Sequence, residues 1–481
     1  MNKIKMINSK YEKLSMVKKS ALWITMCSIV QKGISFLTVP LFTRIMPQAD
    51  YGIYQVYQSW VSFLLIFTSL NLSSGCFNNA MIKYENQRDE YLSSMQILTT
   101  SITVVWGFVF VVFHNFFSAA MQLSPVLIGA MFFELLFEPS YLLWAAKKRF
   151  DYSYKSLVLV TLGIAILMPG VSAIAVVLSS DKATAKIVSG VVTVCIIYFI
   201  IYLNNIKRGK TFFNSFFWKF ALGFNIPLIP HYLSMTVLSQ ADRIMINNMC
   251  SSEEAAIYSI ATNVSLVLVI VVNALNSALI PWQYRQIKKN DIKPIRKNMN
   301  IIIIAAAIIT SLPIVLAPEI VKILAPAEYY EAIWIVPPIA ASTFFILIYS
   351  MCCNIEFYYE KKMMVMIASL SAAIINIVTN AIFIQMFGYI AAGYTTVLSY
   401  IFLAFFHCVF MRYVTKQNGI EGIYNYKIIF LASVLMCILA ILSMLLYRTV
   451  FVRYFIFCVA LMIVFTKKNL IIEYVKKLKN I

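Results

Sequence analysis

Residues 18–52, KKSALWITMCSIVQKGISFLTVPLFTRIMPQADYG, decide how the rest of the chain is interpreted. Two lysines, Lys18 and Lys19, precede about twenty mostly apolar residues, which is the length of a helix that spans a bilayer. Arg44 and a short polar turn follow the run. In its middle stands Lys32, although a charge in hydrocarbon costs at least about 2.5 kcal/mol. The stretch therefore predicts a membrane-spanning helix with a functional lysine.

Composition extends this prediction to the whole chain. Of the 481 residues, 61% are hydrophobic and only 12% are charged, and no soluble fold needs so many apolar side chains. The alternating ten-residue segments of a transmembrane β-barrel are missing from the sequence. The net charge of +20 is spread over segments between apolar runs, which argues against a nucleic-acid surface. We predict an all-α polytopic membrane protein, and we keep the first apolar run as a span because it is too long for a signal peptide.

Hydropathy divides the chain into fourteen candidate membrane spans joined by short loops. None of these loops is large enough for a folded catalytic domain. The spans are 20–44, 52–77, 91–115, 121–146, 155–179, 184–204, 217–246, 254–282, 299–318, 332–355, 363–386, 389–411, 428–446 and 451–466.

The positive charges predict the orientation of these spans. With the amino terminus inside, 32 of the 40 Lys and Arg residues fall in inner segments and seven in outer segments, with Lys32 as the remaining one. Inner segments of membrane proteins carry such an excess of Lys and Arg. We therefore expect both termini in the cytoplasm and basic inner loops that lie against anionic lipid headgroups.

The sequence contains an internal repeat. A shift of 204 residues places Ile53-Tyr54 on Ile257-Tyr258, and it also places a polar triplet of span 2 on a polar triplet of span 8. Both triplets have the spacing i, i+3, i+4, which puts each on one helix face. The triplets are Gln55, Gln58 and Ser59, and Ser259, Thr262 and Asn263.

Spans 1–6 and 7–12 are therefore interpreted as two pseudo-symmetric six-helix lobes, related by an axis along the membrane normal and followed by a helix pair. The predicted parts are a basic cytoplasmic tail at 1–19, an amino-terminal lobe at 20–206, a carboxy-terminal lobe at 207–413, and spans 13 and 14 with a basic tail at 414–481.

Polar side chains gather in spans 1, 2, 7 and 8, with more in span 11. Inside a membrane such groups must face protein or water, and transporters built from repeats bind substrate between the repeats. We interpret the polar faces as the lining of a cavity; the alternative is that small polar residues only join helices through hydrogen bonds. The predicted cavity residues are Gln31, Lys32, Ser35, Gln55, Gln58, Ser59, Asn225, His231, Thr262, Asn263, Asn376 and Asn380.

Lys32 lies roughly 20 Å from the inner end of its span, too deep to reach the surface easily. It needs a carboxylate, a cavity or an anionic ligand. Glu134 and Glu138 lie on one face of span 4 beside Pro139 and could form a fixed ion pair with it. In the alternative interpretation, Lys32 meets a substrate phosphate and a glutamate carries a coupling proton.

Charged residues at the predicted outer boundary are candidates for a gate. Arg44 ends span 1, while Asp242 and Arg243 end span 7, and interfacial anchoring is the other interpretation of these groups. Pro227 and Pro230 should bend span 7 near His231 and could supply a hinge.

No pattern in the sequence indicates catalysis, a metal site or a cofactor. Nine cysteines lie mostly inside apolar runs, where inert buried thiols are expected, and three histidines are scattered. Residues 204–211, NNIKRGKT, end like a phosphate-binding loop but lack its first glycine. We therefore predict that the chain is not an enzyme and that its driving energy comes from a gradient or from the substrate.

Three segments carry a resemblance to a known group. They are Val39 to Met46 with Asp50 to Tyr54, then Gln240 to Ile246, and Phe387 to Gly393. In order and spacing, over about residues 15–415, they resemble the oligosaccharide flippases of O-antigen and capsule export (Wzx-type) of the multidrug/oligosaccharidyl-lipid/polysaccharide exporter superfamily. The resemblance implies that the substrate is a polyprenyl-diphosphate-linked oligosaccharide whose head passes through a cationic cavity. Lys32 fits that scheme as a single-lysine clamp.

The leading hypothesis is therefore a lipid-linked oligosaccharide flippase that works by alternating access. A cation-coupled multidrug antiporter of the same fold is the alternative, since carboxylates such as Glu134 suit it. A membrane glycosyltransferase or polymerase is disfavoured because large outer loops are missing. The resemblance also implies a bacterial inner-membrane location, with the bilayer, a polysaccharide polymerase and chain-length proteins as partners, and no nucleic acid.

Overall fold

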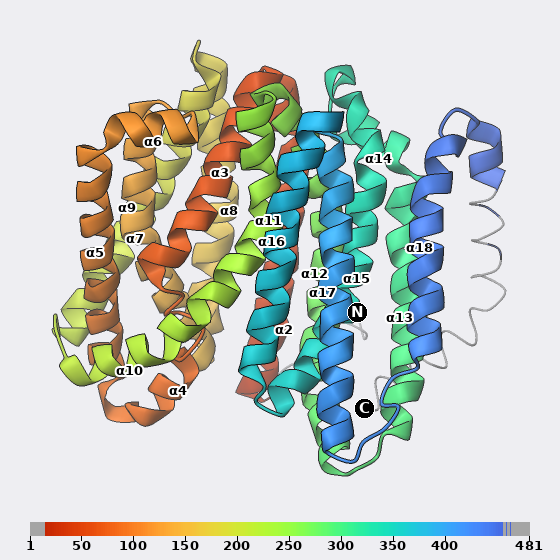
Figure 1. Ribbon diagram of the computed structural model, residues 1–481. Helices are drawn as coiled ribbons and strands as arrows, with labels where there is room; N and C mark the ends of the chain where they lie inside the picture. The colour runs from red at the N-terminus through yellow and green to blue at the C-terminus, as the bar shows by residue number, and fades with distance from the viewer. Residues whose placement is uncertain (1–14, 456–457, 459–461, 463–481) are drawn as a thin grey trace, which may run out of the picture. The chain divides into compact units, whose positions relative to one another are not determined.

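The computed structural model of the protein describes residues 15–455, 458 and 462, and in this part of the chain every regular element is a helix (Figure 1). This confirms the all-α fold class. The chain divides into two compact units, Met1–Ala256 and Ile257–Ile481. The division falls inside α12 rather than at the predicted lobe boundary near residue 206, so the predicted lobes remain a proposal.

The first unit holds the helices up to the start of α12. Helices α3, α5, α7 and α9 pack against one another, while α6 lies at one end of the unit and α4 and α10 lie at the other (Figure 1). The helices are α2 (Met16–Ile45), α3 (Gln48–Ser69), α4 (Phe77–Lys83), η1 (Glu85–Gln87), α5 (Arg88–Val112), α6 (His114–Met121), α7 (Pro125–Phe150), α8 (Tyr154–Leu178), α9 (Lys182–Gly209), α10 (Ser215–Asn225), η2 (Ile226–Leu228) and α11 (Ile229–Met249).

The second unit is built around α15 and α17, which pack closely along their lengths, with α16 against α17 and α13 beside α18. Its helices are the greater part of α12 (Ser252–Lys288), α13 (Lys293–Val315), α14 (Ala317–Leu324), η3 (Ala327–Trp334), α15 (Val336–Tyr358), α16 (Lys362–Phe387), α17 (Ala391–Gln417) and α18 (Tyr426–Leu446).

Twelve helical segments of the described residues are long and apolar enough to cross a membrane, and each coincides with a predicted span. Predicted span 2 forms α3, a helix of 22 residues that is too polar to be counted with them. Predicted span 14 lies largely outside the described residues. The chain is thus a multi-pass membrane protein, and the count of fourteen stays a prediction.

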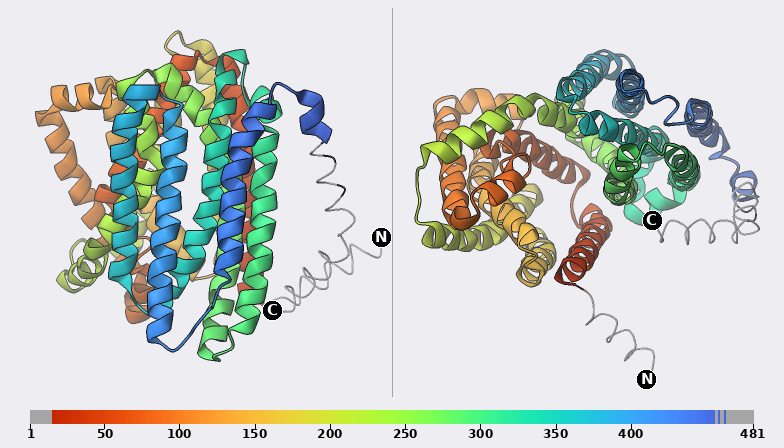
Figure 2. Two further views of the ribbon diagram at one scale, coloured as in Figure 1. Left: turned by 45° about the vertical axis from the view of Figure 1, so that its right-hand side comes forward. Right: turned by 90° about the horizontal axis from the view of Figure 1, so that it is seen from below.

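Among the membrane-length helices of the first unit, α2 has the smallest buried share. It starts at Ser15, whose hydroxyl accepts a hydrogen bond from the Lys18 amide, and it contains Pro40 near its far end. Its main neighbour is α8, beside which it stands at the edge of the unit (Figure 2). Most of its apolar side chains are therefore not covered by the rest of the chain, as expected for a surface that meets lipid or a cavity.

Candidate functional site

Lys32 is an exposed cation in the apolar part of α2. Its neighbour Gln31 is half-buried, and the exposed Ser35 donates its hydroxyl to the Gln31 carbonyl at 3.0 Å. Among the described residues no ion pair includes Lys32, so the fixed pair with Glu134 or Glu138 is not formed. The ammonium therefore remains available to an anionic ligand.

The two glutamates of α7 form a buried carboxylate pair within the first unit. Tyr57 on α3 donates its hydroxyl to Glu134 Oε2 at 2.8 Å, and Glu134 is 9% exposed. Glu138 follows one turn later, and its buried Oε2 has no hydrogen-bond partner among the described residues. Two carboxyls one helical turn apart, each with a buried oxygen, cannot both stay charged without cost, so the pair is suited to hold a proton.

Helices α3 and α11 meet through a polar cluster that contains several predicted residues. Gln240 Oε1 accepts hydrogen bonds from the Ser59 hydroxyl at 3.2 Å and from Arg243 Nη1 at 2.7 Å. Gln55 donates instead to the Tyr51 hydroxyl at 2.8 Å, and Gln58 is half-buried. The cluster ties α11 to the polar face of α3.

Further contacts lie at the end of the first unit where α3 begins and α11 ends, and they join α11 to the end of α6 and α3 to the start of α12. Asn247 Nδ2 donates to Gln122 Oε1 at 2.7 Å, and Asn248 Nδ2 donates to the Ala120 carbonyl at 3.3 Å. A Cβ added to Gly52 would lie 1.8 Å from the Ser252 carbonyl oxygen, so only glycine permits this approach. This end of the first unit is closed.

The predicted gate residues lie in or near this closed end. Asp242 and Arg243 are both buried in α11, and Arg243 joins the Gln240 cluster. Arg44 is exposed in the last turn of α2, where its guanidinium donates to the Pro40 carbonyl at 2.9 Å.

Asn225 and His231 flank the break that the prolines impose on predicted span 7. The segment divides into α10 and α11 around a 3₁₀ turn, as expected from Pro227 and Pro230. Asn225 is fully buried and donates to Cys76 Sγ and to the Ala221 carbonyl, both at 3.0 Å. His231 is half-buried beside the Tyr232 ring.

The remaining predicted residues belong to the second unit. Asn376 and Asn380 are fully buried on α16, where Asn380 donates to the Asn376 side chain at 3.4 Å and accepts from the Thr395 hydroxyl. On α12, Asn263 is buried and Thr262 donates to the Ser259 carbonyl at 2.9 Å. These groups are already hydrogen-bonded within the unit.

Three buried ionisable residues were not identified as candidates from the sequence. Lys186 was counted with the outer segments, yet it is only 5% exposed and its ammonium lies over the rings of Phe42 and Tyr54. Glu356 and His407 form a buried ion pair in the second unit. The available signal was an isolated ionisable residue inside an apolar run, which by itself marks a functional candidate.

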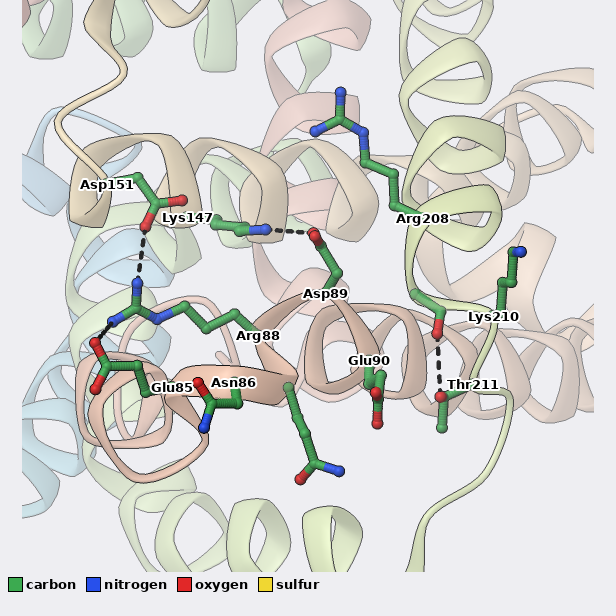
Figure 3. Close-up of a pocket in the computed structure, with 12 residues that line it drawn as sticks. Glu85, Asn86, Arg88, Asp89, Glu90, Lys147, Asp151, Arg208, Lys210 and Thr211 are labelled. Atoms are coloured by element: carbon green, nitrogen blue, oxygen red, sulfur yellow. Dashed lines mark hydrogen bonds and ion pairs between the residues drawn. The ribbon is translucent and has the colours of Figure 1, made fainter.

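A charged pocket of about 930 Å³ lies where α5 begins and α7 and α9 end (Figure 3). Arg88 pairs with Glu85 and with Asp151, each at 3.6 Å, and Lys147 pairs with Asp89. These pairs hold the start of α5 to the end of α7, and the NNIKRGKT segment at the end of α9 supplies part of the wall. Among the described ion pairs none includes Arg208 or Lys210, whose side chains point away from the paired groups (Figure 3).

Comparison with known proteins decides the family. A model of a family described as polysaccharide biosynthesis protein matches residues 17–287, more than half of the chain. The chain belongs to this family of polysaccharide biosynthesis proteins. A second model, of the MatE family, matches residues 227–382. The resemblance to the polysaccharide exporters of this superfamily is thereby confirmed.

Relatives of the chain include two proteins of Haemophilus influenzae. A protein of the Lsg locus is 22% identical over 362 residues, which cover 72% of this chain and 86% of the relative. An uncharacterized membrane protein is 22% identical over 322 residues, which cover 66% of this chain and 75% of the relative.

Solved structures of transporters share its fold. The lipid II flippase MurJ in an inward closed conformation has a TM-score of 0.64 and 13% identity, over 91% of this chain and 100% of that chain. An inward-facing multidrug resistance MATE transporter has a TM-score of 0.59 and 10% identity, over 83% of this chain and 98% of that chain. The family and fold matches are thus to transporters and flippases.

Proposed function

We propose that the protein moves a polyprenyl-diphosphate-linked oligosaccharide from the cytoplasmic to the outer leaflet of a bacterial inner membrane, for surface polysaccharide biosynthesis. The observation that carries the proposal is Lys32, an exposed cation without an ion-pair partner among the described residues, in the apolar part of a membrane-length helix. A diphosphate is the anion that such a group binds as a point charge. The fold of a lipid II flippase supports the same substrate class.

The sugar part of the substrate calls for uncharged hydrogen-bonding groups. Gln31, Ser35 and Gln58 are exposed or half-buried on α2 and α3 and are the candidates within the first unit. His231 on α11 adds an imidazole that is also half-buried. Asn225, Asn376 and Asn380 are buried and hydrogen-bonded, so they reach substrate only if the protein rearranges.

Alternating access requires an end that opens and closes. We infer that the contacts of α11 with α3 and with the end of α6, including Gln240 with Ser59 and Asn247 with Gln122, form the outer gate in its closed state. Asp242 and Arg243 lie in the same helix end and belong to this gate. Opening would expose the polar face of α3 to the outer solution.

Coupling to a proton gradient is assigned to the carboxylates of α7. Glu134 and Glu138 are buried together, and a proton on either one removes the cost of two neighbouring charges. The same feature favours the second candidate function, a cation-coupled multidrug antiporter, because buried carboxylates suit a cationic substrate. The match of the MatE family model to residues 227–382 keeps that candidate in place.

The flippase proposal is tested by replacing Lys32 in a strain that depends on this protein for surface glycan. We expect Lys32→Ala to abolish surface glycan and Lys32→Arg to preserve part of it, because arginine keeps the charge but changes its shape. Lys18→Ala, which removes an exposed cation from the first turn of the same helix, should be neutral.

Normal glycan with Lys32→Ala at normal protein level would contradict the phosphate clamp. Export of cationic dyes by the wild-type protein, without any effect on glycan, would decide for the antiporter.

A polysaccharide polymerase and chain-length proteins are the further partners that the flippase proposal requires. Arg208 and Lys210 are the residues of the charged pocket that we expect to contact anionic headgroups.

A further inference from the structure

The second unit contains a buried acid–imidazole pair that the proposed function does not use. Glu356 lies in the last turn of α15 and His407 lies in α17. His407 Nδ1 is 2.9 Å from Glu356 Oε1 and 3.1 Å from Oε2, so one nitrogen bonds both carboxylate oxygens. The Glu356 side chain is 0% exposed and the His407 side chain is 1% exposed.

Among the described ion pairs, none joins Glu356 or His407 to a second charged residue, and the neighbours named next are weakly ionising groups. The Tyr349 ring stacks on the imidazole with ring centroids 5.7 Å apart. Glu356 acts on the thiols of Cys352 and Cys353 on the same helix. The Cys352 thiol lies beside that of Cys408 on α17, and the phenols of Tyr424 and Tyr426 neighbour these two thiols. Helices α13 and α16 contribute no hydrogen bond or ion pair to either side chain among the described contacts.

The number of protons on the pair decides its net charge. With one proton shared between imidazole and carboxyl, the pair is neutral whichever group holds it. Without that proton the site carries one uncompensated negative charge, and with two protons it carries one positive charge. Either charge costs several kcal/mol in a dry interior, so burial favours the neutral state with a single proton.

Hydration changes this balance. An imidazole exposed to water loses its proton near neutral pH, and an exposed carboxylate is fully ionised there. A separation of α15 from α17 that admits water would therefore release the proton that the buried pair retains.

We propose that Glu356 and His407 form a proton-binding site of the second unit, which holds one proton while α15 and α17 are closed on each other and releases it when water enters between them. The site makes the conformational equilibrium depend on pH, and high pH favours the hydrated state. A single proton changes that equilibrium by at most about tenfold per pH unit. Of the two experiments below, the flipping assay rests on the proposed flippase function, whereas the labelling of cysteines does not.

The first experiment measures flipping of a lipid-linked oligosaccharide in proteoliposomes at equal pH on both sides, across the neutral range. We expect the wild-type rate to change with pH and the Glu356→Gln, His407→Gln double variant to lose that change. The double variant keeps a hydrogen-bonding amide pair and leaves no buried charge alone. Glu360→Gln is the matched control, since it removes an exposed carboxyl just beyond the end of α15 and should keep the wild-type pH dependence.

A second variant guards against misfolding of the first. His407→Lys keeps an ion pair with Glu356 but carries a charge that does not titrate near neutral pH, so it should also lose the pH dependence. If either folded variant keeps the wild-type profile, or if the wild-type profile is flat, the proposal is wrong.

A measurement without substrate separates this proposal from the flippase function. The rate at which a small maleimide labels Cys352 and Cys408 is followed by mass spectrometry, because both thiols lie between the two helices with their sulfurs 3.2 Å apart. The ratio of wild-type to double-variant labelling should rise with pH, even if no flipping is found. A ratio that does not vary with pH would overturn the proposal while leaving the flippase function untouched.

Discussion

Lys186 brings an ammonium group into the interior of the first unit without a carboxylate to balance it. Its Nζ lies 2.8 Å from the centroid of the Phe42 ring and 4.1 Å from that of Tyr54, and no described ion pair includes it. Desolvation of an ion costs several kcal/mol, whereas a desolvated cation–π contact returns about 2 kcal/mol. We therefore expect Lys186→Met to stabilise the purified protein by about 1–3 kcal/mol, seen as a rise in Tm.

The control for this substitution is Lys182→Met, one turn earlier on the same face of α9. Lys182 donates to the Ile45 carbonyl at 2.8 Å, so its loss leaves an acceptor at the end of α2 without that partner and should not stabilise. A fall in Tm for Lys186→Met would mean that the aromatic contacts outweigh the cost of burial. A rise in Tm with a loss of flipping would indicate that the lysine is kept for function at a cost in stability.

At the scale of single residues, the sequence predicted which side chains share a helix face better than it predicted which groups surround them. The i, i+4 relation of Glu134 and Glu138 follows from one helix, and both do share a buried face. The burial of Lys186 depends on rings that lie in α2 and α3, more than a hundred residues away, which no local pattern reveals. Asn225 was predicted in a cavity for its polarity alone, whereas its amide bonds Cys76 inside the unit.

The closed end of the first unit is formed by contacts between the ends of whole helices. The end of α11 is held to the end of α6 by Asn247 and Gln122, and the ends of α3 and α12 touch at Gly52 and Ser252. We expect a cross-link between cysteines at Gln122 and Asn247, in a Cys250→Ser background, to lower flipping at least about tenfold, because the gate can no longer open. Activity should return after reduction of a cleavable linker.

The matched control pair is Asn247→Cys with the native Cys250, which joins two residues at the end of the same helix and should leave flipping unchanged. Undiminished flipping in the cross-linked Gln122–Asn247 protein would show that this end is no gate.

Gly52→Ala should lower the cross-link yield because its Cβ would collide with the Ser252 backbone, whereas Gly33→Ala on α2 meets nothing within 4 Å and should be silent.

The helices themselves were largely predictable, because an apolar run of membrane length has few alternatives. The short helices α6 and α14, of eight residues each, were not predicted, since they are too short to leave a periodic signal. The break between α10 and α11 was expected from its prolines. Helix α3 was predicted as a span, but its polar face, which made it a candidate for the cavity lining, lowers its mean hydropathy below that of a membrane span.

At the scale of the whole molecule, the family and the fold class follow from order and spacing, while orientation rests on charge alone. The distribution of Lys and Arg predicts that the turn between α11 and α12 lies outside and the turn between α12 and α13 lies inside. Each turn offers an exposed position: Cys250 in the first and Lys289 in the second. The two turns are separated by a single helix of membrane length, so they must lie on opposite sides if α12 spans the bilayer.

A membrane-impermeant maleimide applied to intact spheroplasts tests that orientation. We expect it to label native Cys250, and to label a cysteine at Lys289, in a Cys250→Ser background, only after the membrane is permeabilised. Burial raises the pKa of the Cys250 thiol and the Glu254 carboxylate raises it further, so less thiolate is present at neutral pH and the labelling is done at about pH 8. The reverse pattern would invert the chain, placing the gate between α3 and α11 on the cytoplasmic side and making the flippase load its substrate from the opposite leaflet.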